Sequence, residues 1–496
     1  MKVIASKSMF ADASSRQIWL LWLVAALLSA GVYSFTLTLT KHIWQDEVQI
    51  LELGRASLPG ADLSHGMYWN LETDKPARPL SYLGSSIQEL FYRLFYPSVY
   101  GARVSSLLGA ACASAALLGW LLSRGGARWV ALACSLLMFW DPLFVEGYRG
   151  ARIDSWTMAF MLLALWVIAE GRKRPLARSG FERWEIAAGI CIALAGLFWV
   201  SAIILIPLVM HQVLRVDADH SNTPWESRLA SLVWLGFFSV AAMVVLLLPV
   251  APVVGELMAG TFGSVDEKAS GSIQFDAFAA PYVRSPWLPI SAIAALFYAR
   301  QWSLGLVFGT AVVGVLLTGA YVHRNNYLLP YMLLAVAVGG NTLLNVGVGK
   351  GKAFSFAVLL ALLAMLMWSA ALSLGARTFV ALKEKKFRDP ASLEHMVRSN
   401  LPVGTLKAYI IPYELYYAAR SLGWSFYRGG RPEDWTHENQ QSLLSQMDVV
   451  IQRGDDPKSP PEDLMKSLGF SPKKVSTGLG PVQKMENYGE YIIYER

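Results

Sequence analysis

Long apolar runs alternate with short polar stretches along the first three quarters of the chain. A helix that crosses a bilayer needs about 20 mainly apolar residues. Eleven segments meet or approach this length, namely 17–39, 99–122, 129–145, 153–170, 185–199, 200–214, 229–252, 286–299, 303–321, 327–345 and 354–375. The run from 185 to 214 is too long for one span and short for two, so we expect two tilted or partly re-entrant helices there. The pattern predicts a polytopic, mainly α-helical membrane protein of about 11 transmembrane helices.

The pattern changes after Gly375 to a mixed polar sequence of roughly 120 residues, enough for one small domain. Short strands are expected at 406–411, 448–452 and 491–494, helices near 414–422 and 461–468, and loops at 428–431 and 454–457. No G-x-G-x-x-G nucleotide motif is present. The sequence therefore predicts a multi-helix transmembrane domain at 1–375 and a small soluble α/β domain at 376–496.

Lysine and arginine in the short loops predict the orientation, because positive loops are retained in the cytoplasm. With the N-terminus inside, Arg124, the cluster at 172–174, Arg300 and Lys350 all fall on the cytoplasmic side. The same topology places a loop at 41–97, the turns near 150 and 323, and the C-terminal domain outside. We expect a multi-pass protein of the inner (plasma) membrane whose catalytic loops and C-terminal domain are extracytoplasmic.

Composition supports the bilayer as the solvent of this chain. Of its 496 residues 54% are hydrophobic, with 18 Trp and 22 Phe. The net charge of +7 comes from short clusters between apolar runs, so no nucleic-acid partner is expected. Cys112, Cys134 and Cys191 lie inside apolar runs without C-x-x-C spacing, which indicates neither a disulfide framework nor a cysteine metal site. The run at 17–39 is interpreted as a retained first transmembrane helix.

The polar segment from 41 to 82 carries the first candidate chemistry. Only 16% of the chain is charged, yet this segment contains six carboxylates. Asp46 and Glu47 follow the first helix closely, where partial burial can tune a carboxylate into a general base toward a hydroxyl or amine. The alternative is an ordinary solvated pair of acidic residues.

The end of this segment combines cations with prolines. Asp74, Lys75 and Arg78 form a proline-framed turn that leads through Tyr82 into an amphipathic stretch at 84–95. Lysine supplies a point charge and arginine a planar fork for phosphate oxygens. The turn is therefore a candidate site for a lipid phosphate, and the alternative is snorkelling of both cations at the lipid interface.

Two later outer turns carry further ionisable residues. Arg149, Arg152 and Asp154 stand at the start of the fourth apolar segment, where they are either functional or a structural ion pair. His323 and Arg324 occupy the turn before the tenth segment. His323 could be a metal ligand, an acid, a hydrogen-bond donor or merely structural. Arg324 is a candidate counter-charge for a phosphate leaving group.

Five short motifs occur in one order, namely Trp44-Gln45-Asp46-Glu47, Asp74-Lys75-Pro76, Ala102-Arg103-Val104, Ala151-Arg152-Ile153-Asp154 and Arg324-Asn325-Asn326-Tyr327-Leu328-Leu329-Pro330. In this order the chain resembles the GT-C membrane glycosyltransferases that use polyprenyl-phosphate sugars, among them the protein O-mannosyltransferases and the aminoarabinose transferase of lipid A. It departs from that pattern in having Asp74 where the family often has Glu, and in lacking a lysine near 195–199.

The resemblance implies a set of site residues, which are Asp46 and Glu47 next to the reacting centre, Lys75 and Arg324 at the donor phosphate, Arg152 and Asp154 on the pocket floor, and Asp74 as a possible ligand of a divalent metal. It also implies an inverting transfer from a polyprenyl-phosphate-linked sugar to a lipid, glycan or protein acceptor, with Asp46 as general base.

Two other classes fit a polytopic chain with charged outer loops. One is a lipid or glycan transporter or flippase, and the other is a non-catalytic assembly subunit. Transporters tend to have inverted repeats and ionisable residues at mid-membrane depth, whereas the charges here gather on one face. The sequence therefore favours a glycosyltransferase.

Overall fold

The computed structural model describes residues 14–39, 43, 45–57, 69–70, 75–76, 81–95, 98–173, 181–215, 224–255, 258, 275–317, 322–346, 350–401, 406–410, 412–427, 437–453, 460–477 and 488–496. The chain divides into two compact units. The first comprises residues 1–32, 107–148 and 154–375, and the second comprises residues 33–106, 149–153 and 376–496. The domain division predicted at residue 375 stays a prediction.

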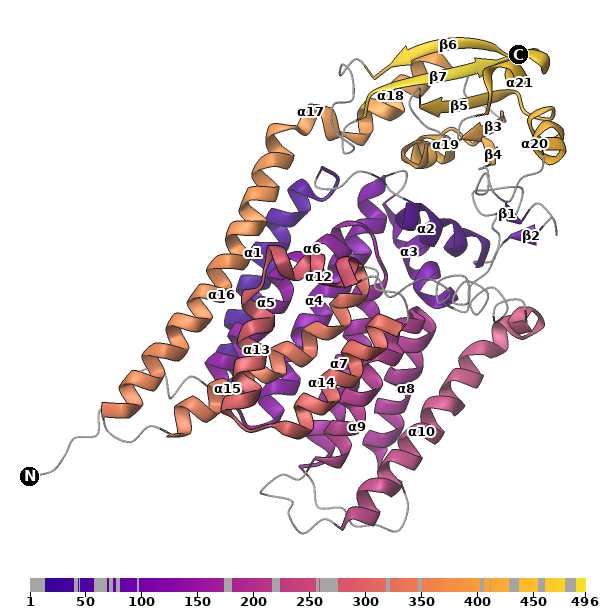
Figure 1. Cartoon of the computed structure of the whole chain (residues 1–496). Helices are drawn as coiled ribbons and strands as arrows, with labels where there is room; N and C mark the ends of the chain where they lie inside the picture. Colours follow the sequence, from indigo (N-terminus) through magenta and orange to yellow (C-terminus); the bar gives the residue numbers. More distant parts are fainter. Residues whose placement is uncertain are drawn as a thin grey trace, which may run out of the picture. The chain divides into compact units, whose positions relative to one another are not determined.

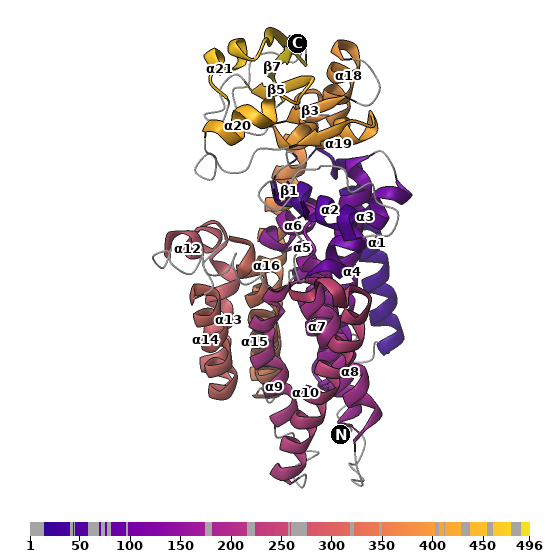
Figure 2. The ribbon, with the colours of Figure 1, turned by 90° about the vertical axis from the view of Figure 1, so that its right-hand side faces the viewer.

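The first unit is built from helices, which are α1 (Ser15–Thr36), α4 (Val99–Ser123), α5 (Arg128–Trp140), α6 (Pro142–Arg149), α7 (Asp154–Gly171), α8 (Arg183–Phe198), η1 (Val200–Leu205), α9 (Ile206–Leu214), α10 (Trp225–Leu247), η3 (Leu248–Val253), α12 (Phe275–Arg284), α13 (Trp287–Tyr298), α14 (Trp302–Leu317), η4 (Val322–Leu328), α15 (Leu329–Val346) and α16 (Lys350–Lys383). The ends of α1, α4, α6 and α16 at 33–36, 99–106, 149 and 376–383 belong to the second unit. Helices α7, α8 and α10 lie side by side, and α15 packs against α13 and α5 (Figures 1 and 2).

All eleven predicted apolar segments contain a helix, so their helical character is confirmed. Among the described residues, five helices are long and apolar enough to cross a membrane: Ser15–Thr36, Val99–Ser123, Trp225–Pro252, His323–Asn345 and Phe354–Lys383. The pair α5 and α6, bent by 49°, makes a sixth if it is one span. The chain is therefore a membrane protein, and the predicted number of about 11 spans stays a prediction, because several apolar helices are shorter than the ~30 Å hydrocarbon core at 1.5 Å per residue.

The continuous apolar run at 185–214 forms separate helices, as predicted. Helix α8 ends at Phe198, and its C-cap residue Trp199 has an extended backbone with φ −158° and ψ 130°. Pro207 then stands in the first turn of α9, where its missing N–H costs no helical hydrogen bond. The hydroxyl of Tyr331 donates to the carbonyl of Ile204 at 2.6 Å, so a side chain satisfies one carbonyl of this interrupted helix.

The second unit combines two short helices with the C-terminal domain. Its further elements are α2 (Gln45–Ser57), β1 (Trp69–Asn70), β2 (Lys75–Pro76), α3 (Tyr82–Leu94), α17 (Lys385–Arg388), α18 (Pro390–Asn400), β3 (Lys407–Ile410), η5 (Tyr413–Leu415), α19 (Tyr416–Ser421), β4 (Ser425–Tyr427), α20 (His437–Leu444), β5 (Val449–Arg453), α21 (Glu462–Ser467), β6 (Ser471–Ser476) and β7 (Glu490–Glu495). Helix α3 confirms the predicted amphipathic stretch, and it packs along α2. Strands β1 and β2 pair antiparallel.

Five strands form one sheet in the order β4-β3-β5-β7-β6. Strands β4, β3 and β5 are parallel, and β7 pairs antiparallel with both β5 and β6. The predicted strands at 406–411, 448–452 and 491–494 and the helices near 414–422 and 461–468 are confirmed. Strand β6 escaped prediction because its side chains are exposed at five of six positions, so it lacks the alternating apolar pattern. The predicted loops at 428–431 and 454–457 lie outside the described residues.

Alternating residues of the strands face two apolar cores. On one face, Ile410, Ile451 and Ile493 pack with Leu51 of α2 and Tyr92 of α3 in a single buried cluster. On the other face lies a smaller cluster that contains Tyr409, Val450 and Tyr494 with residues of α20 and α21. Because a strand alternates its side chains, the same three central strands line both cores. The C-terminal sheet thus shares one core with the helices of the first polar loop.

Candidate functional site

Asp46 and Arg152, separated by more than a hundred residues, form an ion pair in the second unit. Asp46 lies in the first turn of α2, where the positive end of the helix dipole favours a carboxylate. Its side chain is 39% exposed, whereas that of Arg152 is 8% exposed. Nη1 of Arg152 donates to Oδ2 of Asp46. A carboxylate that is oriented by a buried cation and still open to solvent can accept a proton from an incoming group.

The backbone that presents Arg152 is held in an unusual conformation. Ala151 precedes it with φ +53°, a left-handed value that is uncommon for a residue other than glycine. Two side chains fix this turn: Gln88 donates its amide to the carbonyl of Ala151, and Ser106 donates its hydroxyl to the carbonyl of Arg152 at 2.8 Å. Gln88, Ser106, Ala151 and Arg152 are all buried. Tertiary contacts therefore maintain the strained turn that aims Arg152 at Asp46.

Glu47, the neighbour of Asp46, is fully buried. Arg103 of α4 binds it in a bidentate manner, with Nε 3.0 Å from Oε1 and Nη2 2.9 Å from Oε2. Arg103 also donates to the carbonyl of Leu37 at 2.8 Å. The hydroxyl of Tyr417 in α19 donates to Oε1 of Glu47 at 3.0 Å. A carboxylate with three donors and no exposure is suited to a structural role rather than to contact with a substrate.

Helix α19 makes two further polar contacts with the helices of the first loop. The hydroxyl of Tyr416 donates to Oε2 of Glu52 at 2.6 Å. Arg420 binds Glu89 of α3 through two hydrogen bonds of 2.8 and 2.9 Å and lies over the ring of Tyr92, with its guanidinium carbon 4.3 Å from the ring centroid. These groups are buried or nearly so. One short helix of the C-terminal domain thus bonds to both α2 and α3.

Burial sets the protonation state of the two tyrosines in α19. It raises the pKa of Tyr417 well above the ordinary value of about 10, and the negative charge of Glu47 raises it further. Burial likewise raises the pKa of Tyr416, with Arg420 acting in the opposite direction. Both hydroxyls therefore remain protonated donors across the physiological range.

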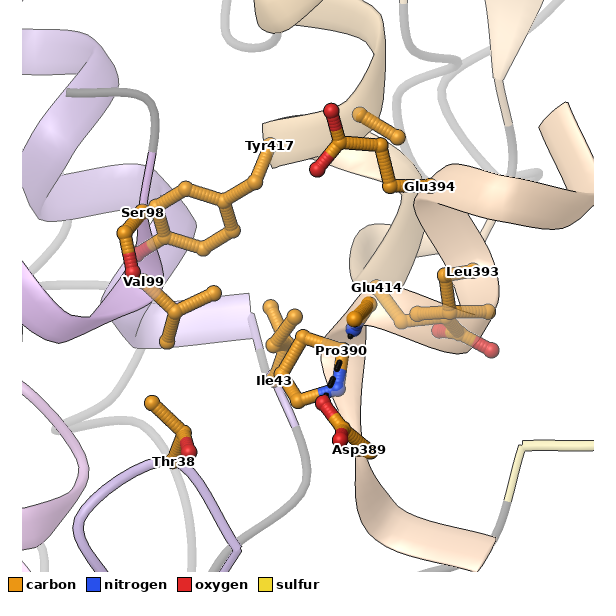
Figure 3. A pocket seen from close by; sticks show the side chains of 12 residues that line it. Thr38, Ile43, Ser98, Val99, Asp389, Pro390, Leu393, Glu394, Glu414 and Tyr417 are labelled. Atoms are coloured by element: carbon orange, nitrogen blue, oxygen red, sulfur yellow. Dashed lines mark hydrogen bonds between the residues drawn. The ribbon is translucent and has the colours of Figure 1, made fainter. Parts of the chain in front are cut away.

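A cavity of about 280 Å³ opens within the second unit beside these contacts. It is lined by Thr38, Ile43, Ser98, Val99, Asp389, Pro390, Ala391, Leu393, Glu394, Glu414, Tyr417 and Ala418. Figure 3 shows the ring of Tyr417 as part of its wall, together with the carboxylates Asp389, Glu394 and Glu414. Tyr417 therefore borders the cavity and also bonds to Glu47.

Three predicted site residues lie in the first unit. Asp154 is the first residue of α7, is buried, and accepts a hydrogen bond of 2.8 Å from the hydroxyl of Tyr327. His323 and Arg324 lie in η4 and are partly buried. This hydrogen bond joins the motif that ends at Asp154 to the motif that contains Tyr327.

The remaining predicted residues have different environments. Arg149 is buried and stacks over Tyr33, with its guanidinium carbon 4.5 Å from the ring centroid. Tyr82 is the first residue of α3 and is buried. Lys75 belongs to β2, of which the structure describes the backbone. Asp74 and Arg78 lie outside the described residues.

No group of three or more His, Cys, Asp or Glu side chains within the described part of the chain is arranged to hold a metal ion. The role suggested for Asp74 as a metal ligand stays a prediction.

The sequence analysis gave no role to Arg103, Tyr417 or Arg420. All three bind buried carboxylates of α2 or α3. A signal existed for Arg103, because an arginine inside a membrane-length apolar helix is itself a functional hypothesis. No local signal existed for Tyr417 and Arg420. Their partners lie more than 300 residues away in the chain.

The solved structures that resemble this chain include ArnT, an archaeal oligosaccharyltransferase and the arabinofuranosyltransferase AftD. ArnT from Cupriavidus metallidurans bound to undecaprenyl phosphate matches with a TM-score of 0.60 at 13% identity, covering 97% of this chain and 98% of ArnT. The Archaeoglobus fulgidus oligosaccharyltransferase in complex with Zn and sulfate matches with a TM-score of 0.52 at 11% identity, covering 87% and 67%. The arabinofuranosyltransferase AftD from Mycobacteria matches with a TM-score of 0.51 at 16% identity, covering 97% of this chain and 42% of AftD.

No protein-family model and no curated protein matches the sequence. Identities of 11 to 16% make the likeness one of fold. It extends over nearly the whole chain, including the C-terminal domain, in the match to ArnT. The resemblance inferred from the five ordered motifs is therefore confirmed, and this chain has the fold shared by these membrane glycosyltransferases, the GT-C fold.

Proposed function

We propose that this protein is a glycosyltransferase that moves a sugar from a polyprenyl-phosphate donor to a cell-envelope acceptor, which is a glycolipid, a polysaccharide or a protein. We place the reaction on the extracytoplasmic face of the inner membrane. The observation that carries the proposal is the ion pair of Asp46 with Arg152 on a GT-C fold. The ArnT structure was solved with undecaprenyl phosphate, a lipid phosphate of the kind that such a reaction releases.

In the proposed reaction Asp46 is the general base. An acceptor hydroxyl or amine loses its proton to the Asp46 carboxylate while its oxygen or nitrogen attacks the anomeric carbon of the sugar. The bond from that carbon to the phosphate oxygen breaks, and the electron pair leaves with the polyprenyl phosphate. Attack and departure occur on opposite faces of the carbon, so the configuration inverts. The 39% exposure of the Asp46 side chain suits this role, because the base must reach the acceptor.

Negative charge develops on the departing phosphate, and cations that stand ready for it lower the barrier. We propose Lys75 and Arg324 for this role, with Arg78, Tyr82, Arg149 and His323 as further substrate-binding candidates. Asp154 receives a positioning role in this scheme, since its carboxylate is buried and bonded to Tyr327.

Glu47 also receives a positioning role. Its side chain has no exposure and binds Arg103 and Tyr417, so it holds the first turn of α2 in place. The two adjacent carboxylates therefore have different roles: the partly exposed Asp46 contacts the acceptor, and the buried Glu47 holds the helix in place.

The test compares wild-type protein with Asp46→Asn in nanodiscs supplied with a lipid-linked sugar extract of the cell envelope. We expect the wild type to release polyprenyl phosphate, and Asp46→Asn to lose about 10²- to 10⁴-fold in rate, the usual contribution of a general base. Asp463→Asn, an exposed change of the same chemistry in α21, should keep full activity. Mass spectrometry of the products identifies the sugar and the acceptor.

Two results would refute the proposal. Equal turnover by wild type and Asp46→Asn would remove Asp46 from the chemistry. Movement of the intact lipid-linked sugar across the bilayer, without release of polyprenyl phosphate, would establish the transporter or flippase instead.

A further inference from the structure

We propose that Tyr417 is a positioning residue for the helix that carries Asp46, so that the C-terminal domain is a working part of the transferase and not an appended cap. The proposal rests on the proposed function, in which Asp46 is the base. Three features of the second unit carry it: the buried bond of Tyr417 to Glu47, the adjacency of Glu47 and Asp46, and the contacts of Tyr416 with Glu52 and of Arg420 with Glu89.

Adjacent residues of a helix point about 100° apart, so fixing one side chain fixes the direction of the next. Glu47 faces the interior with no exposure, and Asp46 faces Arg152 with 39% of its side chain exposed. A small rotation of α2 about its axis would pull Glu47 from its donors and move Asp46 relative to Arg152. The donors of Glu47 therefore also determine where the proposed base points.

Those donors come from two different elements. Arg103 belongs to α4, and Tyr417 belongs to α19 of the C-terminal domain. Arg103 supplies the charge that makes burial of Glu47 tolerable, and it fixes both carboxylate oxygens. Tyr417 adds a neutral donor to Oε1, so its removal leaves the ion pair intact. A change at Tyr417 can therefore alter the orientation of α2 without leaving the charge of Glu47 unpaired. For this reason Tyr417 is the residue to change.

The other bonds of α19 act on the same pair of helices. Tyr416 donates to Glu52 at the middle of α2, and Arg420 binds Glu89 of α3 with both terminal nitrogens. Arg420 also donates to the hydroxyl of Tyr416 at 3.1 Å, which joins the two contacts. Helix α19 therefore binds α2 at two residues and α3 at one, and these contacts lie beside one buried apolar cluster. The hydrogen bonds of this six-residue helix to α2 and α3 fit a role in holding the first loop in place.

The experiment compares Tyr417→Phe with Tyr494→Phe, a matched loss of one buried tyrosine hydroxyl in the same domain. Tyr494 accepts a hydrogen bond of 3.2 Å from Gln452 and belongs to the apolar cluster on the opposite face of the sheet. Amide hydrogen exchange of residues 45–57 is measured for both variants and for wild type, together with kcat and the donor KM of the lipid-linked sugar reaction.

For Tyr417→Phe we expect exchange in 45–57 to rise about tenfold and kcat to fall about tenfold, because one hydrogen bond to a charged group is lost. The donor KM should stay within about twofold of the wild-type value, because the interactions that bind the donor equally in the ground state and in the transition state are unchanged. Tyr494→Phe should match wild type in all three quantities. If Tyr417 had only a structural role, Tyr417→Phe would lower the unfolding temperature, and it would not lower kcat selectively while leaving KM unchanged.

The inference is overturned if Tyr417→Phe leaves both exchange in 45–57 and kcat at wild-type values, or if Tyr494→Phe changes them equally. It is also overturned if kcat falls only in proportion to the folded fraction. Failure of the proposed function has a different signature. A wild type without turnover, or an active Asp46→Asn, refutes the transferase scheme, while the exchange measurement still decides whether Tyr417 holds α2.

Discussion

At the scale of single residues, neighbours in sequence have opposite environments here. Asp46 is partly exposed and Glu47 is fully buried, although both look like equivalent loop carboxylates in the sequence. Burial of Glu47 is possible because Arg103, itself with no exposure, neutralises it at 2.9 Å. A buried ion pair contributes little net stability, but removing one partner leaves an uncompensated charge in a medium that cannot solvate it.

Replacement of Arg103 by methionine should therefore destabilise the protein far more than the loss of a surface arginine. We expect Arg103→Met to cost about 3 to 5 kcal/mol of unfolding free energy, since the buried Glu47 would lose both hydrogen bonds and the positive charge of its partner. Thermal unfolding in detergent measures the difference. The control is Arg398→Met in α18, whose partner Glu394 is 34% exposed, and it should cost at most about 1 kcal/mol. Similar losses in both variants would contradict the buried pair.

At the scale of elements, α2 and α3 act as one packed pair, and a glycine sets their spacing. A Cβ atom added to Gly54 of α2 would lie 2.0 Å from the carbonyl oxygen and 2.6 Å from the carbonyl carbon of Ser85 in α3. Both are backbone atoms, so no side-chain rotation can relieve the clash. Because Glu89 of α3 is held by Arg420 and Glu52 of α2 by Tyr416, a shift of α3 would strain the contacts of both helices with α19.

Gly54→Ala should force the two helices apart. We expect a loss of about 1 to 3 kcal/mol in stability, the usual range for overpacking, together with lower transferase activity. Gly31→Ala in α1 is the matched change, because nothing lies within 4 Å of an added Cβ there. It should be neutral or stabilise by about 0.5 to 1 kcal/mol, since alanine restricts the unfolded chain more than glycine does. Unfolding temperatures of the two variants test the contrast, and equal values would mean that the helices do not approach at Gly54.

At the scale of the whole molecule, segments that lie far apart in the sequence form the second unit. The second unit combines residues from the first loop, a five-residue turn at 149–153 and the C-terminal domain. Such an assembly requires that the loop, the turn and the domain emerge on the same side of the membrane, because their residues share one apolar core and one set of buried hydrogen bonds.

This requirement gives a topological prediction. Alkaline phosphatase, which is active only outside the cytoplasm, should be active when fused after Arg496 and inactive when inserted in the basic loop near Lys173. The physical reason is the retention of positive loops in the cytoplasm, where the sequence predicts that Arg172 and Lys173 lie. Phosphatase activity on colonies and in fractionated membranes measures the outcome. The reverse pattern would place the site in the cytoplasm and contradict the proposed use of a lipid-linked donor on the outer face.

The sequence by itself determined the membrane class, the eleven helical segments, three strands of the C-terminal sheet and the order of five motifs. It could do so because hydrophobic length and periodicity are local properties, written in consecutive residues. The pairing of Asp46 with Arg152 was accessible only as an implication of resemblance, and its geometry depends on a left-handed Ala151 that nothing local requires.

The tertiary structure alone decided which acidic residue of the dipeptide is buried and which helix of the C-terminal domain contacts it. Tyr417 and Glu47 are 370 positions apart, and their bond depends on how the sheet and the first-loop helices close a common core. Propensity and periodicity cannot report such contacts, because a side chain is buried by its neighbours in space and not by its neighbours in sequence. For this reason the sequence could name candidate site residues, while the buried contacts that hold them were found only in the tertiary structure.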